Sequence, residues 1–260
     1  MRRVLLFIGL TAALAGCTQK PEAPASNTPA PQPSATEPAA PEASPAAAGP
    51  AEQAPAAAAS TAASTGPARP IPSNWKVDVN YQIIVPAQPT SVEPGQVEII
   101  EFMWLGCPHC YELNPYIEAW KKKLPAYVAF RQEHVTWDAL RRPHAQLFYT
   151  LQALGAGDDL IIKAFEELHR KGETSDTTER EQEAFAVANG LDGAAFKREY
   201  DGFTVKTSLK RADELVRRYR IDQVPTVIVN GKYLTDVSMA GSPEKLTQLL
   251  NDLAASEKGN

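Results

Sequence analysis

A long segment near the start of this 260-residue chain lacks the residues from which a hydrophobic core is built. Residues 18–70 contain no Val, Ile, Leu, Met, Phe, Trp or Tyr, and 13 of the 22 prolines lie between Pro21 and Pro72. Because such a segment cannot bury enough apolar surface to offset the loss of chain entropy, we expect it to be disordered. As a flexible coil, residues 18–73 would span about 40 Å, and fully extended they would reach about 170 Å. The composition therefore predicts a tether over residues 17–73.

The sequence also lacks the marks of several common classes of binding protein. Its formal net charge of -5 falls to -7 once Arg2 and Arg3 are removed with a leader segment, so no basic surface for nucleic acid is expected. We find no phosphate-binding glycine loop and no internal repeat. What remains is a folded region of about 185 residues from Asn74 onward, the size of one domain or of one domain with an insertion.

The N-terminus, "MRRVLLFIGLTAALAGC", has the pattern of an export signal. Two arginines precede an apolar run from Val4 to Leu14, and small residues then lead to Cys17. The apolar run is shorter than the stretch of about 20 residues that a membrane-spanning helix needs. We therefore predict a signal peptide over residues 1–16 and a mature protein in an oxidising compartment, where disulfide bonds persist.

The end of this segment, "LAGC", resembles the lipobox of bacterial lipoproteins, in which cleavage falls before the cysteine and the new N-terminal cysteine carries the lipid. By this resemblance Cys17 is a lipid anchor. The alternative is an ordinary signal peptide that has a cysteine at this place by chance. Thr18 follows Cys17 where an aspartate would favour the inner membrane, so the known sorting rules favour anchorage in the outer membrane.

Apolar patterning from Asn74 to the C-terminus alternates between strands and helices. The predicted elements with clear boundaries are strands at 78–86, 96–104 and 126–135, a helix at 108–123 and a hairpin at 225–236. Gly breaks divide the block between the third strand and the hairpin into several helices, and a last helix begins after Ser242. This order predicts a thioredoxin-like α/β fold with a helical insertion at about residues 138–218.

Two of the three cysteines lie in the stretch "FMWLGCPHCYEL", at the junction between the second predicted strand and the helix that follows it. The first N–H groups of a helix lack partners within it, so a thiolate on Cys107 is stabilised there. Helix N-termini and Cys-x-x-Cys motifs lower a cysteine pKa to about 3.5–7.5. His109 can add a positive charge or a donor, and Cys110, one turn further in, is the natural resolving thiol. Together with Pro108 these residues predict a redox-active pair.

The same motif is compatible with other kinds of site. The two cysteines could bind a metal with His109 as a further ligand, but the sequence has no second Cys-x-x-Cys and structural zinc requires four ligands. A purely structural disulfide would close a very small loop and gain little entropy. His109 could also be an ordinary exposed helix residue. We therefore expect no metal site.

Together with a second stretch, "QVPTVIVNG", the motif "CPHC" after a buried strand resembles the DsbA family of periplasmic thiol:disulfide oxidases from Gram-negative bacteria. The resemblance covers the element order from Asn74 to the C-terminus, and its most specific parts are the Pro-His dipeptide and the Val-Pro-Thr triplet. In the family the proline of that triplet is cis and lies against the active-site disulfide, and the residue before it pairs with the substrate backbone. The resemblance assigns these roles to Pro225 and Val224.

The resemblance also implies a residue that carries protons and a partner that reoxidises the protein. Glu101, six residues before Cys107, matches a buried glutamate that the family places beneath the cysteine pair, where it takes and gives protons. Glu101 could instead be a strand residue paired in a salt bridge. The family further implies a monomer that needs no dissociable cofactor and is reoxidised by a quinone-linked membrane oxidase of the DsbB type.

We therefore expect a lipid-anchored oxidase that donates the Cys107–Cys110 disulfide to reduced polypeptides entering the periplasm. A disulfide reductase or isomerase is the main alternative, although isomerases of this superfamily usually carry a folded dimerisation domain, which residues 18–73 cannot form. A metal-binding redox lipoprotein that uses the same two cysteines is a third hypothesis.

Replacing Cys17 by Ala should abolish lipid modification and membrane fractionation, because no thiol remains to carry the lipid, while the folded domain stays active. Palmitate labelling of cells that express the wild-type chain or the Cys17→Ala variant measures the first effect. The control is Thr18→Ala, which leaves the cysteine in place and should be labelled normally. Unchanged labelling of Cys17→Ala would contradict the lipoprotein prediction.

Overall fold

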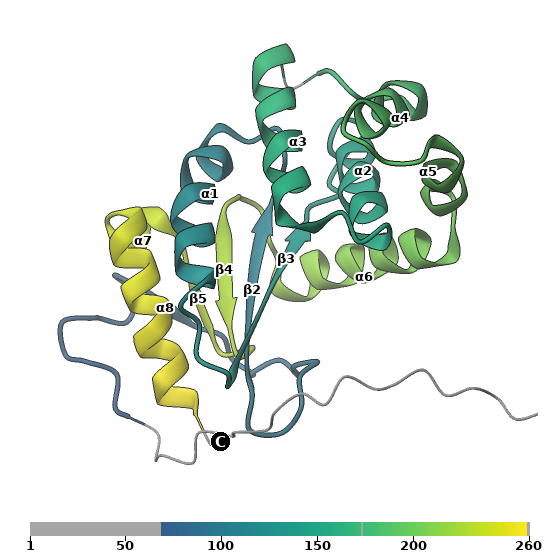
Figure 1. Cartoon of the computed structure of the whole chain (residues 1–260). Coiled ribbons are helices and arrows are strands. Elements are labelled where there is room, and N and C mark those ends of the chain that lie inside the picture. The colour runs from purple at the N-terminus through teal and green to yellow at the C-terminus, as the bar shows by residue number, and fades with distance from the viewer. Residues whose placement is uncertain (1–68, 173, 259–260) are drawn as a thin grey trace, which may run out of the picture. The chain divides into compact units, whose positions relative to one another are not determined.

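The computed structural model describes residues 69–172 and 174–258 (Figure 1). The predicted signal peptide at 1–16, and the predicted tether as far as residue 68, lie outside the described residues. The last part of the predicted tether contacts the folded domain, since the Arg69 backbone N–H donates to the carbonyl of Ala255 at 3.1 Å and Ile71 packs against the core. Contacts of the folded domain therefore begin ahead of the predicted boundary at Asn74.

The described part of the chain is built around a five-stranded mixed sheet. Its strands are β1 (Gln82–Ile83), β2 (Val97–Met103), β3 (Val128–His134), β4 (Thr226–Val229) and β5 (Tyr233–Thr235), in the spatial order β1-β5-β4-β2-β3. β2 pairs in parallel with β3 and antiparallel with β4, and all seven of its residues are buried. Burial on both faces explains why this strand is almost continuously apolar. The strands predicted at 96–104 and 126–135 are thus confirmed.

The strand predicted at 78–86 is wrong in extent, because β1 contains only two residues. The residues before it use their backbone hydrogen bonds locally. The N–H of Asp78 donates to the carbonyl of Tyr81 at 2.8 Å, in a turn where Asp78 has a φ of 60°. Beyond β1, Pro86 has no N–H to donate to a neighbouring strand. Only two residues are therefore left to pair with β5.

Eight helices within the described residues surround the sheet. They are α1 (Pro108–Lys121), α2 (Arg141–Ala153), α3 (Gly157–Lys171), α4 (Glu179–Ala188), α5 (Gly193–Tyr200), α6 (Phe203–Tyr219), α7 (Val237–Ala240) and α8 (Pro243–Glu257). The helices α2 to α6 form the block between β3 and β4, where the sequence predicted a helical insertion. In the described ranges, no helix combines the length and the apolar composition that crossing a bilayer requires.

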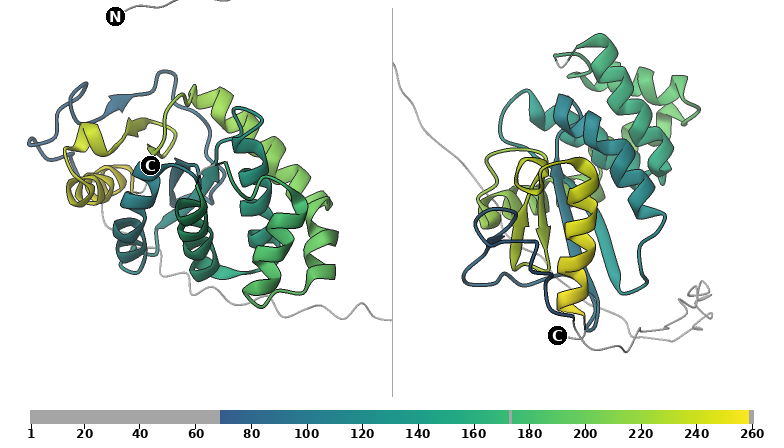
Figure 2. Two further views of the ribbon diagram at one scale, coloured as in Figure 1. Left: turned by 90° about the horizontal axis from the view of Figure 1, so that it is seen from above. Right: turned by 90° about the vertical axis from the view of Figure 1, so that its left-hand side faces the viewer.

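Helices cover both faces of the sheet, as two further views also show (Figure 2). Val97 and Ile99 of β2 share one buried cluster with residues of α1 and α8, while Ile100 and Phe102 share another with residues of the inserted helices. Successive side chains of a strand point to opposite faces, so β2 joins the two halves of the core. The first half fixes α1 beside α8, and the second fixes the insertion beside the end of β2.

The hairpin predicted at 225–236 is confirmed as β4 and β5, joined at Asn230 and Gly231. Both turn residues have positive φ, 50° and 65°, as a type I′ turn requires. A Cβ on Gly231 would lie 2.1 Å from a backbone carbonyl oxygen, so this position needs glycine. The register pairs Thr226 with Phe102. The residues just before β4 therefore lie at the end of the sheet where the chain leaves β2.

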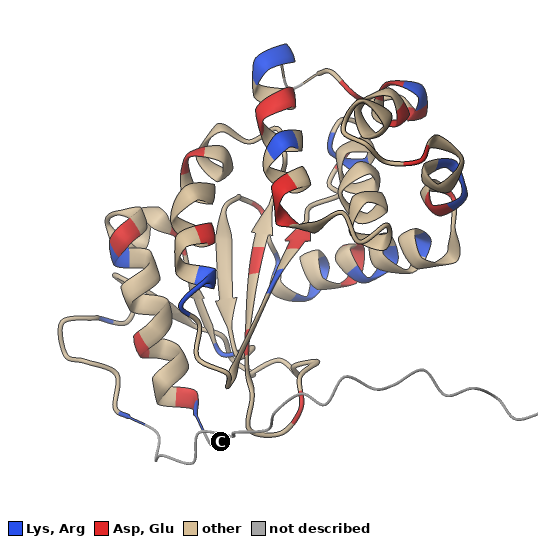
Figure 3. Ribbon diagram, viewed as in Figure 1, with Lys and Arg blue, Asp and Glu red and all other residues tan. Residues whose placement is uncertain are grey.

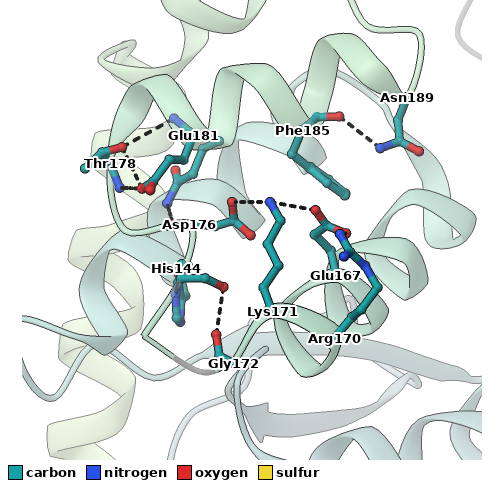
Figure 4. A network of polar contacts seen from close by, with 12 residues as sticks. His144, Glu167, Arg170, Lys171, Gly172, Asp176, Thr178, Glu181, Phe185 and Asn189 are labelled. Carbon is teal, nitrogen blue, oxygen red and sulfur yellow. Dashed lines mark hydrogen bonds and ion pairs between the residues drawn. The ribbon is translucent and has the colours of Figure 1, made fainter.

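Polar contacts fix the connection between α3 and α4 (Figure 4). Lys171, at the end of α3, pairs with Glu167 at 2.6 Å and with the buried Asp176 at 3.1 Å. The Gln182 side chain donates to the carbonyl of Asp176 at 2.6 Å, and α4 begins with a capping box in its first turn. These contacts tie Asp176, on the described part of the connection, to the end of α3 and the start of α4.

Candidate active site

The chain leaves β2 at Met103, makes a tight turn and enters α1 with Cys107 as the N-cap. The backbone N–H of Cys107 donates to the carbonyl of Trp104 at 2.9 Å, which closes the turn. The Cys107 backbone is extended, and its sulfur accepts the N–H of Cys110 at 3.4 Å. Pro108 follows at the first helical position, where its missing N–H leaves no helix bond unmade. A cysteine sulfur thus occupies the place where an oxygen of Ser, Thr, Asp or Asn usually caps a helix.

This position lowers the pKa of Cys107 to about 6. The largest cause is the side-chain hydrogen bond from Cys110. Burial opposes it, because the side chain is only 6% exposed and desolvation disfavours the thiolate. The backbone N–H groups of Cys110 and His109 and the charge of His109 add to the lowering. At neutral pH the reduced Cys107 is therefore mostly a thiolate.

Cys110 has the opposite character. Burial raises the pKa of its thiol well above the usual value, and the hydrogen bond to Cys107 and the charge of that thiolate raise it further. The side chain is 1% exposed and lies one helical turn inside α1. Both cysteines are free thiols in this structure. The pair therefore consists of an acidic outer thiol and a buried thiol that keeps its proton.

His109 lies between the cysteines but is 80% exposed, and its Nδ1 is 3.4 Å from Oε2 of Glu112. Its backbone N–H stabilises the Cys107 thiolate more than its charge does. The charge effect expected from the sequence is therefore the weaker of the two. The His109 side chain also forms part of the wall of a groove.

The loop before β4 lies against the outer cysteine. The Cys107 sulfur is 3.6 Å from the carbonyl oxygen of Val224, and the Val224–Pro225 peptide bond is cis. The residue before them is also held, because the Gln223 amide donates to the Asp236 carboxylate at 2.9 Å. The fold thus brings Val224 next to Cys107 across 117 positions of sequence.

A groove of about 310 Å³ opens beside the cysteine motif. Its wall is mainly apolar and is built from the first turns of α1, the loop before β4 and the segment between β5 and α8. The lining residues are His109, Glu112, Leu113, Gln223, Val224, Pro225, Asp236, Val237, Ser238 and Pro243. Two of them, Glu112 and Asp236, carry carboxylates. The groove therefore offers a mainly apolar surface with two acidic side chains beside the cysteine motif.

Glu101 lies within β2, an interior strand of the sheet, and Figure 3 shows acidic positions on this strand. Its side chain is 1% exposed and accepts a hydrogen bond from Gln132 of β3 at 2.9 Å. Burial raises the pKa of its carboxyl to about 7, although the Gln132 bond and the charge of Lys121 lower it. Within the described residues its partner is an amide and not the cation of a salt bridge. A carboxyl with this pKa can take or release a proton near neutral pH.

Two residues of β3 support the site, and sequence reasoning identified neither. Gln132 is paired in register with Glu101. His134 is fully buried, its Nε2 accepts the N–H of Leu105 at 3.1 Å, and its Nδ1 lies 2.7 Å from the Val135 carbonyl oxygen. Burial lowers the pKa of His134 to about 3, so the ring is neutral and donates through Nδ1. Both residues could have been identified only from the register in which β2 pairs with β3.

The metal hypothesis depends on how many ligands meet at one place. Within residues 69–172 and 174–258, no group of three or more His, Cys, Asp or Glu is arranged to hold a metal ion. Cys17, the third cysteine, lies outside the described residues. The reaction that Cys107 and Cys110 support by themselves is thiol–disulfide exchange.

Two family models match the chain. Residues 117–251 match the DSBA-like thioredoxin domain, and residues 1–18 match the prokaryotic membrane lipoprotein lipid attachment site. The first match begins after the Cys107–Cys110 motif and includes the loop before β4. The second includes Cys17, the residue expected to carry the lipid.

Similar proteins have the name thiol:disulfide interchange protein DsbA. The relative from Azotobacter vinelandii is 36% identical over 187 residues, which cover 72% of this chain and 86% of the relative. The relative from Pseudomonas aeruginosa is 36% identical over 166 residues, which cover 64% of this chain and 78% of the relative.

Solved structures show the same fold. The crystal structure of Pseudomonas aeruginosa DsbA is 33% identical with a TM-score of 0.67, and the match covers 71% of this chain and 95% of that one. The oxidoreductase DsbA of Xylella fastidiosa is 22% identical with a TM-score of 0.64, covering 70% and 96%, which is a likeness of fold. The predicted thioredoxin-like fold with a helical insertion is confirmed.

The lowered pKa of Cys107 should make the reduced protein more stable than the oxidised protein at neutral pH. A thiol with a pKa of about 6 when folded and about 8.5 when unfolded adds stability that is complete above the unfolded value and is lost as the pH falls through the folded value. The full shift corresponds to about 3 kcal/mol above the unfolded pKa, of which about 1.4 kcal/mol is present at pH 7. Urea titrations of both redox forms on either side of the folded pKa measure the difference. A more stable oxidised form at neutral pH would defeat this expectation.

Replacing Glu101 by Gln should stabilise the protein in alkaline solution and change little in acid. A buried carboxyl whose pKa is raised to about 7 costs free energy once it ionises, and the carboxyl of the unfolded chain ionises near about pH 4.3. We expect a gain on the order of 2 kcal/mol above the folded pKa, because glutamine keeps an oxygen for the Gln132 bond. Urea titrations across this pH range measure it, with Glu112→Gln at an exposed position as the control. A gain that does not vary with pH would contradict the raised pKa.

Proposed function

The chain belongs to the DSBA-like thioredoxin domain family, and from this membership and the unequal acidity of its two cysteines we propose that it is a periplasmic thiol:disulfide oxidase. Protein thiol:disulfide oxidoreductase activity follows from the family. In the proposed role, the Cys107–Cys110 disulfide is donated to reduced polypeptides after their export. The observation that carries this direction of transfer is a Cys107 pKa near 6 beside a Cys110 thiol whose pKa is raised well above the usual value.

Transfer begins when a substrate thiolate attacks the sulfur of Cys107 in the oxidised enzyme. A bond forms between the substrate sulfur and Cys107, and the Cys107–Cys110 bond breaks with its electron pair going to Cys110. Because burial raises the pKa of the Cys110 thiol, the released sulfur takes up a proton. Glu101, whose pKa lies near 7 and whose charge acts on Cys110, is the proposed donor of that proton.

A second substrate thiolate then attacks the substrate sulfur of the mixed disulfide. The substrate disulfide forms, and Cys107 leaves with the electron pair as a thiolate. Two electrons have passed from the substrate to the enzyme, which is now a dithiol. The low pKa makes Cys107 a good leaving group, so the exchange favours oxidation of the substrate.

We assign the binding of substrate to the groove beside Cys107. An extended segment of an unfolded chain can pair with the backbone at Val224, whose carbonyl oxygen is 3.6 Å from the sulfur, while its side chains rest on the apolar wall. The carboxylates of Glu112 and Asp236 in the wall favour neutral or basic segments over acidic ones. Pro225 lies in the same wall and has no N–H to compete for the substrate backbone.

The lipid attachment site makes this a membrane-anchored protein of the periplasm. We propose further that Cys17 carries the lipid, that the anchor lies in the outer membrane because Thr18 follows it, and that the chain from Cys17 to the domain is a tether. The proposed reoxidising partner is a quinone-linked membrane oxidase of the DsbB type, and the proposed working form is a monomer.

The reduction potential of the Cys107–Cys110 couple tests the direction of transfer. We expect a potential above about -180 mV in glutathione buffers, and rapid formation of disulfides in a reduced, unfolded substrate protein. A potential near about -270 mV, the region of thioredoxin, would overturn the proposal and favour a reductase. Stoichiometric, tight uptake of zinc by the reduced protein would instead favour the metal-binding lipoprotein.

Replacing Pro225 by Thr should slow the release of mixed disulfides and trap substrates on Cys107. The change adds a backbone N–H and a hydroxyl to the wall where the substrate segment is proposed to lie, and this disturbs the approach of the second thiolate. Non-reducing gels of periplasmic extracts measure the trapped complexes. Pro125→Thr, at an exposed proline outside the groove, is the matched control. Normal turnover without trapped complexes in Pro225→Thr would refute the assignment.

A further inference from the structure

A histidine of the helical insertion contacts the turn before the catalytic cysteine. Trp104, in this turn, is 5% exposed, and its indole Nε1–H donates to Nδ1 of His144 at 2.9 Å. His144 lies on α2 and is fully buried, and its Nε2 is 2.8 Å from the carbonyl oxygen of Ser175. Since Nδ1 accepts the indole proton, Nε2 carries the ring proton and donates it to Ser175. The imidazole thus bridges the turn and the insertion.

Polar contacts surround the far side of this bridge. Ser175 lies in the connection between α3 and α4, whose ion pair between Lys171 and Asp176 is drawn in Figure 4, where His144 lies beside the connection. The Ser175 hydroxyl donates to the carbonyl of Gly172 at 2.7 Å. The acceptor of the imidazole N–H is therefore held in place by its own neighbours, and the histidine ring has a fixed support.

The insertion also contacts the face of the indole. Arg141, one turn before His144 on α2, places its guanidinium carbon 4.4 Å from the centre of the Trp104 ring. A cation over an indole face is attracted by the electron density of the ring. The same helix therefore holds Trp104 at its N–H and over its face.

The indole in turn shapes the catalytic turn. A Cβ added to Gly106 would lie 2.5 Å from Cζ2 of Trp104, so the Gly106 backbone packs directly on the ring. The carbonyl of Trp104 accepts the N–H of Cys107 at 2.9 Å. If the indole ring moves, Cys107, which caps α1, moves with it. The contact between the Cys107 sulfur and the Cys110 N–H then changes as well.

We propose that His144 is a positioning residue for thiol–disulfide exchange, which holds Cys107 at the N-cap of α1 through Trp104 and so couples the helical insertion to the reactive sulfur. The inference rests on the proposed function and deepens it. No step of the exchange passes through the imidazole. If the acceptor is removed, the buried indole N–H is left unsatisfied, and the ring shifts to regain a partner.

The test uses three full-length variants. His144→Leu removes the acceptor, Trp104→Phe removes the donor, and His144→Asn keeps a carbonyl oxygen near the position of Nδ1. Ultraviolet absorbance of the thiolate against pH gives the pKa of Cys107, and glutathione equilibration gives the reduction potential. We expect the Cys107 pKa to rise by about half a unit or more in His144→Leu and Trp104→Phe, which is about a threefold loss of thiolate at a pH below the folded pKa. The potential should become more negative, and His144→Asn should restore most of both values.

A control on the same helix separates positioning from stability. Leu151→Ala truncates another fully buried residue of α2 and should lower the free energy of unfolding without moving the Cys107 pKa. An unchanged pKa in folded His144→Leu and Trp104→Phe would overturn the proposal, whatever happens to stability. If His144→Leu does not fold, the comparison of Trp104→Phe with the wild type decides. Oxidation of a reduced substrate by the wild type is measured in parallel. If the wild type fails to oxidise the substrate, the proposed function is contradicted. The comparison of Cys107 pKa values still decides whether His144 is a positioning residue.

Discussion

The hydrogen bond from the Cys110 N–H to the Cys107 sulfur joins the fold of this protein to its chemistry. It is the capping bond of α1, and an ionised acceptor makes such a bond stronger than a neutral one. The free energy of starting the helix therefore depends on whether the sulfur is a thiolate or part of a disulfide. The elements that fix the end of β2 and the start of α1 also position the two partners of this bond.

Burial raises the pKa of both cysteines, but only at Cys110 does it decide the outcome. At the surface of the motif, donors outweigh desolvation and Cys107 becomes acidic. Below it, desolvation dominates, so Cys110 keeps its proton and Glu101 holds one near neutral pH. The motif thus combines a thiolate that leaves easily with a buried thiol and a buried carboxyl that hold their protons more firmly. The interior position of β2, between β4 and β3 and covered on both faces, makes this gradient of solvation possible.

The parts of the site that could be predicted from the sequence are contiguous or carried by short motifs. Cys107 and Cys110 lie at a strand-to-helix junction that apolar spacing alone indicates. The supporting contacts depend on strand register and on packing, which the spacing of residues in the sequence does not show. Gln132 reaches the site because β2 pairs with β3. His144 contacts Trp104 from a position 40 residues away in the sequence. The strand predicted at 78–86 was wrong for a related reason, because apolar alternation does not reveal hydrogen bonds that a turn uses locally.

Neither edge of the sheet is a good template for another strand. β1 offers two residues and is soon followed by Pro86, and the seven residues of β3 include the charged pair Arg131 and Glu133. Long, flat, apolar edges recruit extended chains and begin aggregation. An enzyme whose substrates are unfolded polypeptides meets extended chains continuously. Its blunt edges therefore disfavour strand-like pairing at the sides of the sheet, away from the groove in which we propose that substrate binds.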